Sequence, residues 1–424
     1  MNNPVLAARE AQSHSSESIP AEQAVLSPGA AALPAGNRTL EACYNIADLR
    51  EAARRRLPRC VFEFFDRGSE DEVALRNNRE AFQRIRMRNK VMVDVSQIST
   101  ASTLFGKPMA MPLAIAPTGV AGVCWYEGEI ELAKAAAKAG VPFTLATPTV
   151  TALEKIAAVE GGRKWFQLYM WRERDLSHAL VRRARDAGFE ALILTADTPV
   201  SPIREYNRRN GFSMPFRPNA AALIDMAMHP SWLITTMGRY WRTTGMPKLA
   251  HYPENHAGAA SGKPAKSAVP NLRGDNLSWD DIRQLRELWK GPILLKGVHL
   301  PEDAARAVAE GVDGIVISNH GGRNLDTAVA PIEILPEIAA EVGGKTTIIL
   351  DSGIRRGGDI VKALALGADA VLSGRPTLYG TSVAGEAGAL HALDILKKEM
   401  EAVLGFTGCP TVADISERTV WMPK

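Results

Sequence analysis

The segment Gly314-Ile315-Val316-Ile317-Ser318-Asn319-His320-Gly321-Gly322-Arg323 joins a short apolar run to a polar turn that carries a histidine and an arginine. The apolar run predicts a buried strand, and the glycines that follow predict its end. An imidazole titrates near neutral pH and suits proton abstraction, whereas a guanidinium can hold a carboxylate with two parallel hydrogen bonds. The segment therefore predicts a base beside an acid-binding group, with a capped turn and solvated side chains as the alternative.

Apolar runs of the same kind recur along the chain and alternate with stretches of helical periodicity. The predicted strands are 112–116, 142–146, 165–169, 191–195, 293–296, 314–318, 347–351 and 370–373. The predicted helices are 129–139, 151–160, 176–187, 279–290, 301–310, 331–341, 358–366 and a long final segment. About eight such units predict an α/β fold, a TIM (β/α)8 barrel. A doubly wound sheet is the alternative, but its Gly-x-Gly-x-x-Gly turn after the first strand is absent.

Three regions lie outside this repeat. Residues 1–40 are rich in Ala, Ser, Pro, Glu and Gln, which predicts a disordered tail before a barrel domain at 41–424. An N-terminal extension, 41–110, contains a predicted helix at 46–56 and an aromatic segment at 61–65, which we interpret as packing. A long insertion, 198–278, separates the fourth strand from its helix and is typical of a lid, an interface or an anchor.

Composition excludes several other classes of protein. Of 424 residues, 46% are hydrophobic and 23% charged, which are ordinary globular values, and a net charge of +3 is too small to indicate nucleic-acid binding. The four cysteines are scattered without a C-x-x-C pair, so we expect neither a disulfide framework nor a structural metal site. There is neither a secretory signal nor an apolar run long enough to cross a membrane, so we expect a cytoplasmic protein.

Polar residues follow nearly every predicted strand. In chain order they are Thr118, Thr147, Gln167 with Tyr169, Thr195 with Asp197, Lys296, His320 with Arg323, Asp351, and Gly374 with Arg375. Because active sites of TIM barrels lie at the C-terminal ends of the strands, these residues predict one site on that rim. Asp197 suits the orientation of His320, although Asp-Thr-Pro is also a common turn.

Two glycine and arginine loops follow the last two strands, where barrels of this kind often bind phosphate. They are Asp351-Ser352-Gly353-Ile354-Arg355-Arg356-Gly357 and Ser373-Gly374-Arg375. Glycines let backbone N–H groups approach phosphate oxygens, and arginines supply bidentate charge. Lys296 needs an anionic neighbour at its strand end, and the edge of a reduced flavin would serve. A Schiff-base lysine and a buried salt bridge are the alternatives for Lys296.

Several segments together resemble the FMN-dependent 2-hydroxy acid dehydrogenases and oxidases over about residues 41–424. They are Ile115-Ala116-Pro117-Thr118-Gly119, Phe166-Gln167-Leu168-Tyr169, Leu194-Thr195-Ala196-Asp197-Thr198-Pro199, Leu295-Lys296-Gly297-Val298, the segment from Ser318 to Asp326, and the two phosphate loops. The Ser-Asn-His-Gly-Gly-Arg motif is the most specific of them. Within the family, the resemblance is greatest to the (S)-mandelate dehydrogenase branch, and it rests on Gly245-Met246-Pro247-Lys248-Leu249-Ala250 and on Ile360 to Leu372 with Thr377-Leu378-Tyr379-Gly380.

The resemblance implies a role for each site residue. On the catalytic side it implies His320 as the base with Asp197 as its partner, and Arg323, Arg204 and Tyr169 as substrate contacts. It implies FMN contacts from Thr118, Gln167, Thr195, Lys296, Ser318, Asp351, Gly353, Arg355, Gly374 and Arg375, the last group forming the phosphate clamp. No metal is implied.

Three positions depart from the family pattern. Phe64 stands where a tyrosine usually helps to bind the substrate carboxylate, so the site either binds acids more weakly or accepts a bulkier, more apolar acid. Gly119 replaces the alanine of glycolate oxidase-like members, as in the mandelate dehydrogenase branch. Ala146-Thr147-Pro148 replaces a loop of glycolate oxidase, so no role is carried over to it.

The resemblance implies an enzyme that oxidises an (S)-2-hydroxy acid, mandelate-like or lactate-like, to the 2-oxo acid, with His320 taking either the hydroxyl or the α proton. We expect reduced FMN to pass electrons to a quinone or cytochrome. An L-lactate dehydrogenase, an oxygen-using oxidase and a catalytically degenerate flavin-binding barrel are the alternatives. Apolar and aromatic residues edged by arginines at 219–242 predict peripheral contact with the inner face of the membrane, or else a lid or subunit interface. The family resemblance also implies a homo-oligomer, a tetramer.

Overall fold

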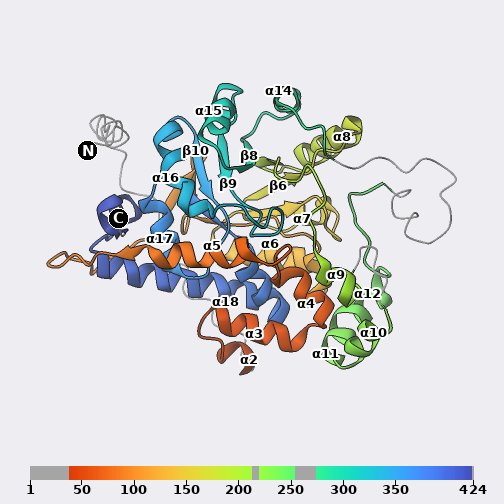
Figure 1. Cartoon of the computed structure of the whole chain (residues 1–424). Coiled ribbons are helices and arrows are strands. Elements are labelled where there is room, and N and C mark those ends of the chain that lie inside the picture. Colours follow the sequence, from red (N-terminus) through yellow and green to blue (C-terminus); the bar gives the residue numbers. More distant parts are fainter. Residues whose placement is uncertain (1–37, 213–218, 254–273, 423–424) are drawn as a thin grey trace.

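Eight parallel strands close into a barrel, which confirms the predicted TIM-barrel fold (Figure 1). The computed structural model describes residues 38–212, 219–253 and 274–422. The barrel strands are β4 (Leu113–Ile115), β5 (Phe143–Ala146), β6 (Lys164–Leu168), β7 (Ala191–Thr195), β8 (Ile293–Val298), β9 (Gly314–Ile317), β10 (Thr347–Leu350) and β11 (Ala370–Ser373). They pair in chain order, and β11 closes the barrel on β4.

The barrel strands read as continuous apolar runs because both of their faces are buried. Alternate residues pack together in a cluster separate from the larger outer core, and they include Ile193, Leu294, Val316 and Ile349. Because side chains alternate along a strand, the residue two positions further on lies on the same inner side. Those next positions are Thr195, Lys296, Ser318 and Asp351. The strand period therefore carries the functional residues to the C-terminal mouth of the barrel.

Helices surround the barrel and lie close to the predicted positions. They are α6 (Gly128–Ala139), α7 (Leu153–Ala157), α8 (Arg174–Asp186), α14 (Trp279–Leu288), α15 (Pro301–Ala309), α16 (Pro331–Val342), α17 (Gly357–Ala365) and α18 (Arg375–Thr407). Helix α7 is shorter than predicted because Thr151 bonds the buried Glu129 before the helix begins. The long helix α18 packs on α6, α3 and α17 and is bent at Ala384 and Gly385.

The N-terminal extension packs helices beside the mouth of the barrel and contributes a hairpin to its inner cluster. Its helices are α2 (Arg38–Glu41), α3 (Ile46–Arg56), α4 (Arg59–Asp66) and α5 (Val73–Arg84). Of the disordered tail predicted for 1–40, residues 1–37 lie outside the described part of the chain. Residues 38–40 belong to α2 instead. The hairpin of β2 (Ser102–Leu104) and β3 (Lys107–Met109) places Leu104 and Met109 in the inner cluster. A short pair of β1 (Arg86–Met87) and β12 (Val420–Trp421) joins the two ends of the domain.

The aromatic segment at 61–65 lies in α4 and supports the packing interpretation only in part. Phe62 and Phe65 are buried in the main core, as packing residues should be. Phe64 instead lines the cavity described below, and Phe65 also contributes to its lining. The periodicity of α4 explains this result, because a helix of buried residues that crosses the mouth of the barrel must turn one side chain toward it.

The insertion gathers several short helices at one corner of the molecule (Figure 1). They are α9 (Glu205–Asn210), α10 (Ala220–Ala227), α11 (Pro230–Trp232), the π-helical η2 (Leu233–Met237) and α12 (Gly238–Thr243). Trp232 Nε1 donates to the carbonyl of Val123 at 2.8 Å, and Tyr240 Oη accepts from the backbone N–H of Glu127 at 3.0 Å. One side of the insertion is thus fixed to the barrel. Within the part of the chain that is described, no helix has the length and apolarity needed to span a membrane.

Candidate active site

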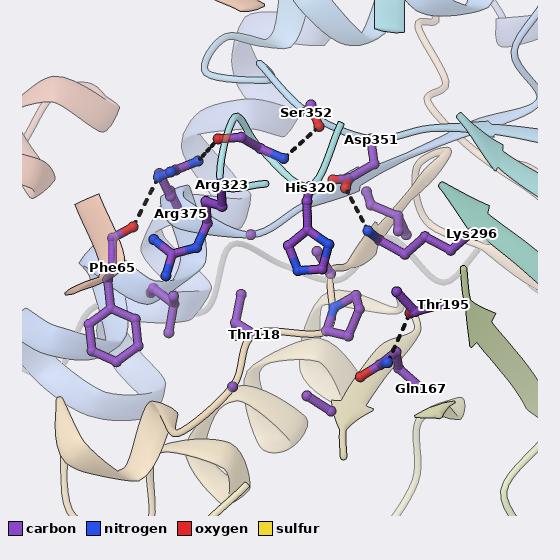
Figure 2. Close-up of a pocket in the computed structure, with 18 of the residues that line it drawn as sticks. Phe65, Thr118, Gln167, Thr195, Lys296, His320, Arg323, Asp351, Ser352 and Arg375 are labelled. Carbon is purple, nitrogen blue, oxygen red and sulfur yellow. Dashed lines mark hydrogen bonds and ion pairs between the residues drawn. The ribbon is translucent and has the colours of Figure 1, made fainter. Parts of the chain in front are cut away.

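The residues predicted to be catalytic or to bind FMN meet at one cavity in the mouth of the barrel, and Figure 2 shows part of its lining. Every one of them lines it except Asp197 and Ser318, which contact lining residues directly. The cavity contains about 1060 Å³ of empty space out to its open mouth, which is enough for a cofactor and a small substrate. Side chains from α4, from the loop after β4 and from the insertion complete its walls.

His320 and Asp197 lie within hydrogen-bonding distance of each other at the cavity. His320 Nδ1 lies 3.1 Å from both carboxylate oxygens of Asp197, and its Nε2 lies 3.2 Å from Tyr169 Oη. Burial lowers the pKa of His320, although the neighbouring carboxylate partly opposes it. Burial would raise the pKa of Asp197, but attraction from His320 and Lys296 outweighs it and lowers that pKa to about 2. The pair thus holds a neutral imidazole beside a charged carboxylate, the arrangement of a general base.

His320 adopts an unusual backbone conformation, with φ at 58°. Left-handed φ values cost a non-glycine residue about 1–2 kcal/mol and are concentrated at functional sites. The turn is held because the backbone N–H of His320 donates to Ser318 Oγ at 3.0 Å, and that of Gly321 donates to Ser352 Oγ at 2.9 Å. Hydroxyl acceptors on both sides of the histidine therefore fix the direction of its ring.

Other residues of the same motif attach it to the N-terminal extension. Asn319 and Asn78 exchange two amide hydrogen bonds, at 2.7 and 2.9 Å, between the motif and α5. Asp326 accepts from the backbone N–H groups of Asp71 and Ala74, both at 3.1 Å. Sequence reasoning missed these positioning contacts, and also that of Ser352. An asparagine or serine in a glycine-rich loop can cap its own turn or bond a residue far away in the chain, and the sequence does not distinguish the two cases.

Arg323 and Arg204 bring two positive charges to the side of the cavity near His320. Arg323 Nη1 donates to the carbonyls of Phe64 and Arg67, at 2.6 and 2.9 Å, and Arg204 Nη2 donates to the carbonyl of Arg323 at 2.7 Å. Neither guanidinium pairs with a carboxylate among the described residues. Burial lowers the pKa of Arg323 to about 10, and the nearby Arg204 adds to this effect. Two adjacent buried cations without an acidic partner make this side a binding site for an anion.

Lys296 lies deep in the cavity within a hydrogen-bonded chain. Its Nζ donates to Ser318 Oγ at 3.0 Å, and that hydroxyl donates to Asp351 Oδ2 at 2.6 Å. The ammonium also lies 3.6 Å from Asp351 and 4.0 Å from Asp197. The contacts of Lys296 thus agree with the buried salt bridge that was one alternative for this residue. The side chain still lines the cavity, so its charge also faces whatever is bound there.

Gln167 and Thr195 form a polar edge on the neighbouring strands. Gln167 Nε2 donates to Thr195 Oγ1 at 2.8 Å, and Gln167 Oε1 accepts from the backbone N–H of Thr147 at 3.2 Å. Thr147, also predicted on the rim, directly follows β5 but does not line the cavity. Its side chain is fully buried and donates to the carbonyl of Gln167, so it positions Gln167 from behind.

The far end of the cavity is lined by the loops after β10 and β11. Arg375 donates to the carbonyls of Phe65, Asp66 and Gly321, at 2.9–3.1 Å. Among the described residues, the Arg355 guanidinium donates only to the carbonyl of Ile354, through Nη1. Burial lowers the pKa of Arg355 to about 10. Gly353 has a φ of 94°, and a Cβ atom there would lie 2.5 Å from the carbonyl of Asn78. Only glycine therefore allows this loop to pack so closely against α5.

The donor set fits a cofactor that carries a phosphate and a polar ring. The lining holds five cations and one carboxylate, Asp351; the cations are Arg204, Lys296, Arg323, Arg355 and Arg375. Thr118 Oγ1 is buried in the same wall and has no hydrogen-bond partner among the residues described, which is costly unless a ligand supplies one. An enzyme barrel with a basic, glycine-lined cavity on its C-terminal rim is of the phosphate-binding, cofactor-dependent class.

Comparison with known proteins identifies the family. Residues 53–422 match the model of the FMN-dependent dehydrogenases. The chain is 40% identical to (S)-mandelate dehydrogenase of Pseudomonas putida over 88% of this chain and 92% of that protein. It is also 40% identical to L-lactate oxidase of Nostoc sp., over 88% and 96% of the two chains. A crystal structure of the monotopic membrane protein (S)-mandelate dehydrogenase matches with a TM-score of 0.83 and 38% identity, covering 90% of this chain and all of that one.

This chain belongs to the FMN-dependent dehydrogenase family. It is a flavoprotein oxidoreductase whose cofactor is FMN. The resemblance read from its sequence is thereby confirmed, including the similarity to the mandelate dehydrogenase branch.

Proposed function

We propose that the enzyme oxidises an (S)-2-hydroxy acid to the 2-oxo acid, and that it does so at the cavity of His320. The observation that carries this proposal is the neutral histidine paired with Asp197 beside two arginines that have no acidic partner in the described structure. A base and an anion-binding group are the two features that a 2-hydroxy acid requires. The names of the relatives, mandelate dehydrogenase and lactate oxidase, support the same substrate class.

On the substrate side, Arg323 and Arg204 bind the carboxylate and so fix the orientation of C2. Tyr169 lies 3.2 Å from His320 Nε2, and its hydroxyl donates to the oxygen atoms of the acid. Burial raises the pKa of Tyr169, so it remains a neutral donor across the working range of pH. His320 Nε2 accepts a proton from the substrate, and Asp197 stabilises the imidazolium that results.

On the cofactor side, the ring of FMN is held by Thr118, Gln167, Thr195, Lys296 and Ser318. Asp351 contacts the ribityl chain, and Gly353, Arg355, Gly374 and Arg375 hold the phosphate. The free N–H groups of Arg355 and the unpartnered hydroxyl of Thr118 support these assignments. FMN, when bound, accepts the two electrons that the substrate loses. The charge of Lys296 favours that reduction, because it lies in the cavity with only partial compensation from Asp351.

The test is anaerobic reduction of the bound flavin by a panel of glycolate, lactate and the two enantiomers of mandelate. We expect loss of the flavin absorbance near 450 nm with at least one (S)-acid and none with (R)-mandelate. A yellow protein that no 2-hydroxy acid reduces would contradict the proposal and would favour the degenerate flavin-binding barrel.

We further propose that the reduced enzyme passes electrons to a quinone or cytochrome and touches the membrane through 219–242. Leu223, Ile224, Ile234 and Trp241 are exposed there, the last by 78%, although they are apolar. Arg239, Arg242 and Lys248 are exposed around them. An apolar face with a basic edge is suited to an anionic membrane surface, and a solved relative is a monotopic membrane protein. This exposure argues against the lid alternative, in which these side chains would be covered.

Sedimentation with anionic vesicles tests the membrane contact. We expect the wild type to bind and the double variant Ile234→Glu, Trp241→Glu to stay in solution, with Leu300→Glu as an exposed control elsewhere. Equal binding of all three would contradict the proposal. The electron acceptor is tested by comparing the rates at which the reduced enzyme reduces a soluble quinone and consumes oxygen. Faster reduction of the quinone would support the proposed acceptor, and faster consumption of oxygen would favour an oxidase.

We also propose that the enzyme is a homo-oligomer, a tetramer. Val91, Met92, Phe406, Trp421 and Met422 are exposed apolar side chains at the end where β1 and β12 pair, and Met92 is fully exposed. Apolar exposure of this kind is typical of a contact between proteins. Light scattering during gel filtration should give four times the mass of the chain, and a monomer would contradict the proposal.

A further inference from the structure

His251 joins the insertion to the loop that follows β5. It lies in the described segment after α12, and its side chain is buried. The backbone N–H of Leu153, the first residue of α7, donates to His251 Nε2 at 3.1 Å. Because Nε2 accepts this bond, the ring proton is on Nδ1, which donates to the carbonyl of Thr147 at 3.2 Å. Burial lowers the pKa of His251 to about 4, so the ring is neutral at working pH and holds both backbone groups.

Thr147 in turn contacts two residues that line the active-site cavity, Gln167 and Tyr169. Its backbone N–H donates to Gln167 Oε1 at 3.2 Å, and its hydroxyl donates to the carbonyl of Gln167 at 2.7 Å. The same hydroxyl accepts from the backbone N–H of Tyr169 at 3.0 Å. Its carbonyl accepts from His251 and from the backbone N–H of Thr149, the latter at 3.0 Å. Because one residue makes all these bonds, a displacement of its carbonyl also disturbs the bonds to Gln167 and Tyr169.

The insertion holds this loop at a second point. The backbone N–H of Ala250 donates to the carbonyl of Thr149 at 2.8 Å. The ring of His251 also packs edge-on against Phe166, with ring centres 5.7 Å apart and an interplanar angle of 70°. Phe166 precedes Gln167 on β6 and is fully buried. A phenyl ring has a shape similar to that of an imidazole but makes neither hydrogen bond, so substitution can separate the packing of His251 from its hydrogen bonding.

From these contacts we infer that His251 is a positioning residue for the active site. It holds Thr147, which fixes the side chain of Gln167 beside the FMN ring and the backbone of Tyr169 beside the substrate. The insertion thus contributes to the reaction through His251 in addition to the substrate contact of Arg204. This inference rests on the proposed function, because it takes over the roles proposed there for Gln167 and Tyr169.

Two amide substitutions separate the two hydrogen bonds of His251. The amide of an asparagine lies near the position of Nδ1, and that of a glutamine lies near the position of Nε2. His251→Asn therefore keeps a donor for Thr147 and loses the acceptor for Leu153, whereas His251→Gln does the reverse. His251→Phe loses both bonds. His391→Phe is the matched control, since His391 also bonds a backbone carbonyl, that of Cys43 at 2.7 Å, but lies on α18 away from the cavity lining.

The first readout is the midpoint potential of FMN in the loaded enzyme, measured by titration with dithionite in the absence of any acid. Loss of the bond to Thr147 should loosen the Gln167 amide, and a weaker donor to the ring favours the electron-rich reduced flavin less. We therefore expect the potential to fall in His251→Gln and His251→Phe. It should match the wild type in His251→Asn and His391→Phe. Equal potentials in all four variants would overturn the inference.

The second readout is the rate of anaerobic flavin reduction by the acid that reduces the wild type fastest. His251→Gln and His251→Phe should be slower by about 10- to 100-fold, and His251→Asn should stay within about threefold of the wild type. Thermal midpoints should fall similarly in His251→Asn and His251→Gln, because each loses one buried hydrogen bond. Equal rates in these two variants would show a merely structural role and overturn the inference. If no acid reduced the wild type, the proposed function would fail, whereas the potentials would still test the positioning of Gln167.

Discussion

The two ends of the active-site cavity carry the same kind of charge, but they are assembled from different parts of the chain. At the cofactor end, Arg355 and Arg375 follow the neighbouring strands β10 and β11 within one stretch of sequence. At the substrate end, Arg323 follows β9, Arg204 belongs to the insertion and Phe64 belongs to α4. The first end is a local product of the barrel, whereas the second depends on three separate regions that pack against its mouth.

Because the two ends come from different parts of the chain, residues at one end can be substituted without altering the other. The glycine loops at the cofactor end have little freedom, because a Cβ atom at Gly353 would overlap the carbonyl of Asn78. At the substrate end, the wall residue Phe64 stacks on Phe212 with ring centres 4.2 Å apart, and the Arg323 guanidinium lies 5.1 Å from the centre of the Phe64 ring. We therefore expect substitutions at this wall to alter the choice of acid without moving the cofactor loops. Each prediction below separates one end from the other.

Arg323→Met should have the largest effect at the substrate end. Loss of a bidentate, charge-assisted contact with the carboxylate should lower kcat/KM about 1000-fold. FMN content should stay near that of the wild type, because Arg323 is assigned to the acid alone. Arg209→Met, on the exposed side of α9, is the control and should behave as the wild type. Loss of FMN with unchanged kinetics after reconstitution would show that the two ends are not separate.

Asp197→Asn should lower kcat about 100-fold, because the imidazolium that forms during reaction loses its charged partner. The pH profile gives a second readout. Burial holds the pKa of His320 below the ordinary value of 6.5, so wild-type kcat/KM should be constant above that pH and fall about tenfold per unit below the lowered pKa. Asp197 raises the pKa of His320, so the variant should move this acid limb to lower pH. A limb that stays in place would contradict the pairing.

Arg355→Met tests the cofactor end and should raise the dissociation constant of FMN about 10- to 50-fold. The guanidinium is buried with a single carbonyl partner among the described atoms, so the phosphate is its missing counter-ion. Once reconstituted with excess FMN, the variant should keep the KM of the wild type for the acid. Fluorescence titration of the apoprotein with FMN measures the first effect. A changed KM at saturating FMN would argue against the division of the cavity.

Phe64→Tyr should have the smallest effect, and it is the only one in the favourable direction. A hydroxyl on the cavity wall beside Arg323 adds one hydrogen bond to the carboxylate, worth about 1.5 kcal/mol or tenfold in KM for a small acid such as lactate. Phe406→Tyr, at a 70% exposed position, is the control. A KM for lactate that does not fall would mean that Phe64 faces the substituent of the acid rather than its carboxylate.

The fold and the cofactor end could be predicted from sequence because both are local. The ends of strands follow from apolar runs, and β7 and β11 have the predicted bounds. The alternation of side chains along each strand brings Lys296, Ser318 and Asp351 together at the mouth of the barrel. The strand β8 was underestimated by two residues, because Gly297 introduces a bulge that no apolar pattern records.

The substrate end was less accessible because it depends on tertiary contacts. Nothing in the apolar segment of α4 indicates that Phe64 turns to the cavity while its neighbours are buried. The amide pair of Asn78 and Asn319 joins residues far apart in the chain. The role of Arg204 came from family resemblance, whereas that of Arg323 was already predicted from its own segment.

The most direct test of a base at the junction of the two ends is single-turnover reduction of the bound flavin in His320→Ala. Wild type and variant should carry the same amount of FMN, since His320 is assigned no contact with the phosphate or the ring. After anaerobic mixing with saturating acid, absorbance near 450 nm should decay about 1000- to 10,000-fold more slowly in the variant. Decay at the wild-type rate would contradict the assignment of His320 as the base.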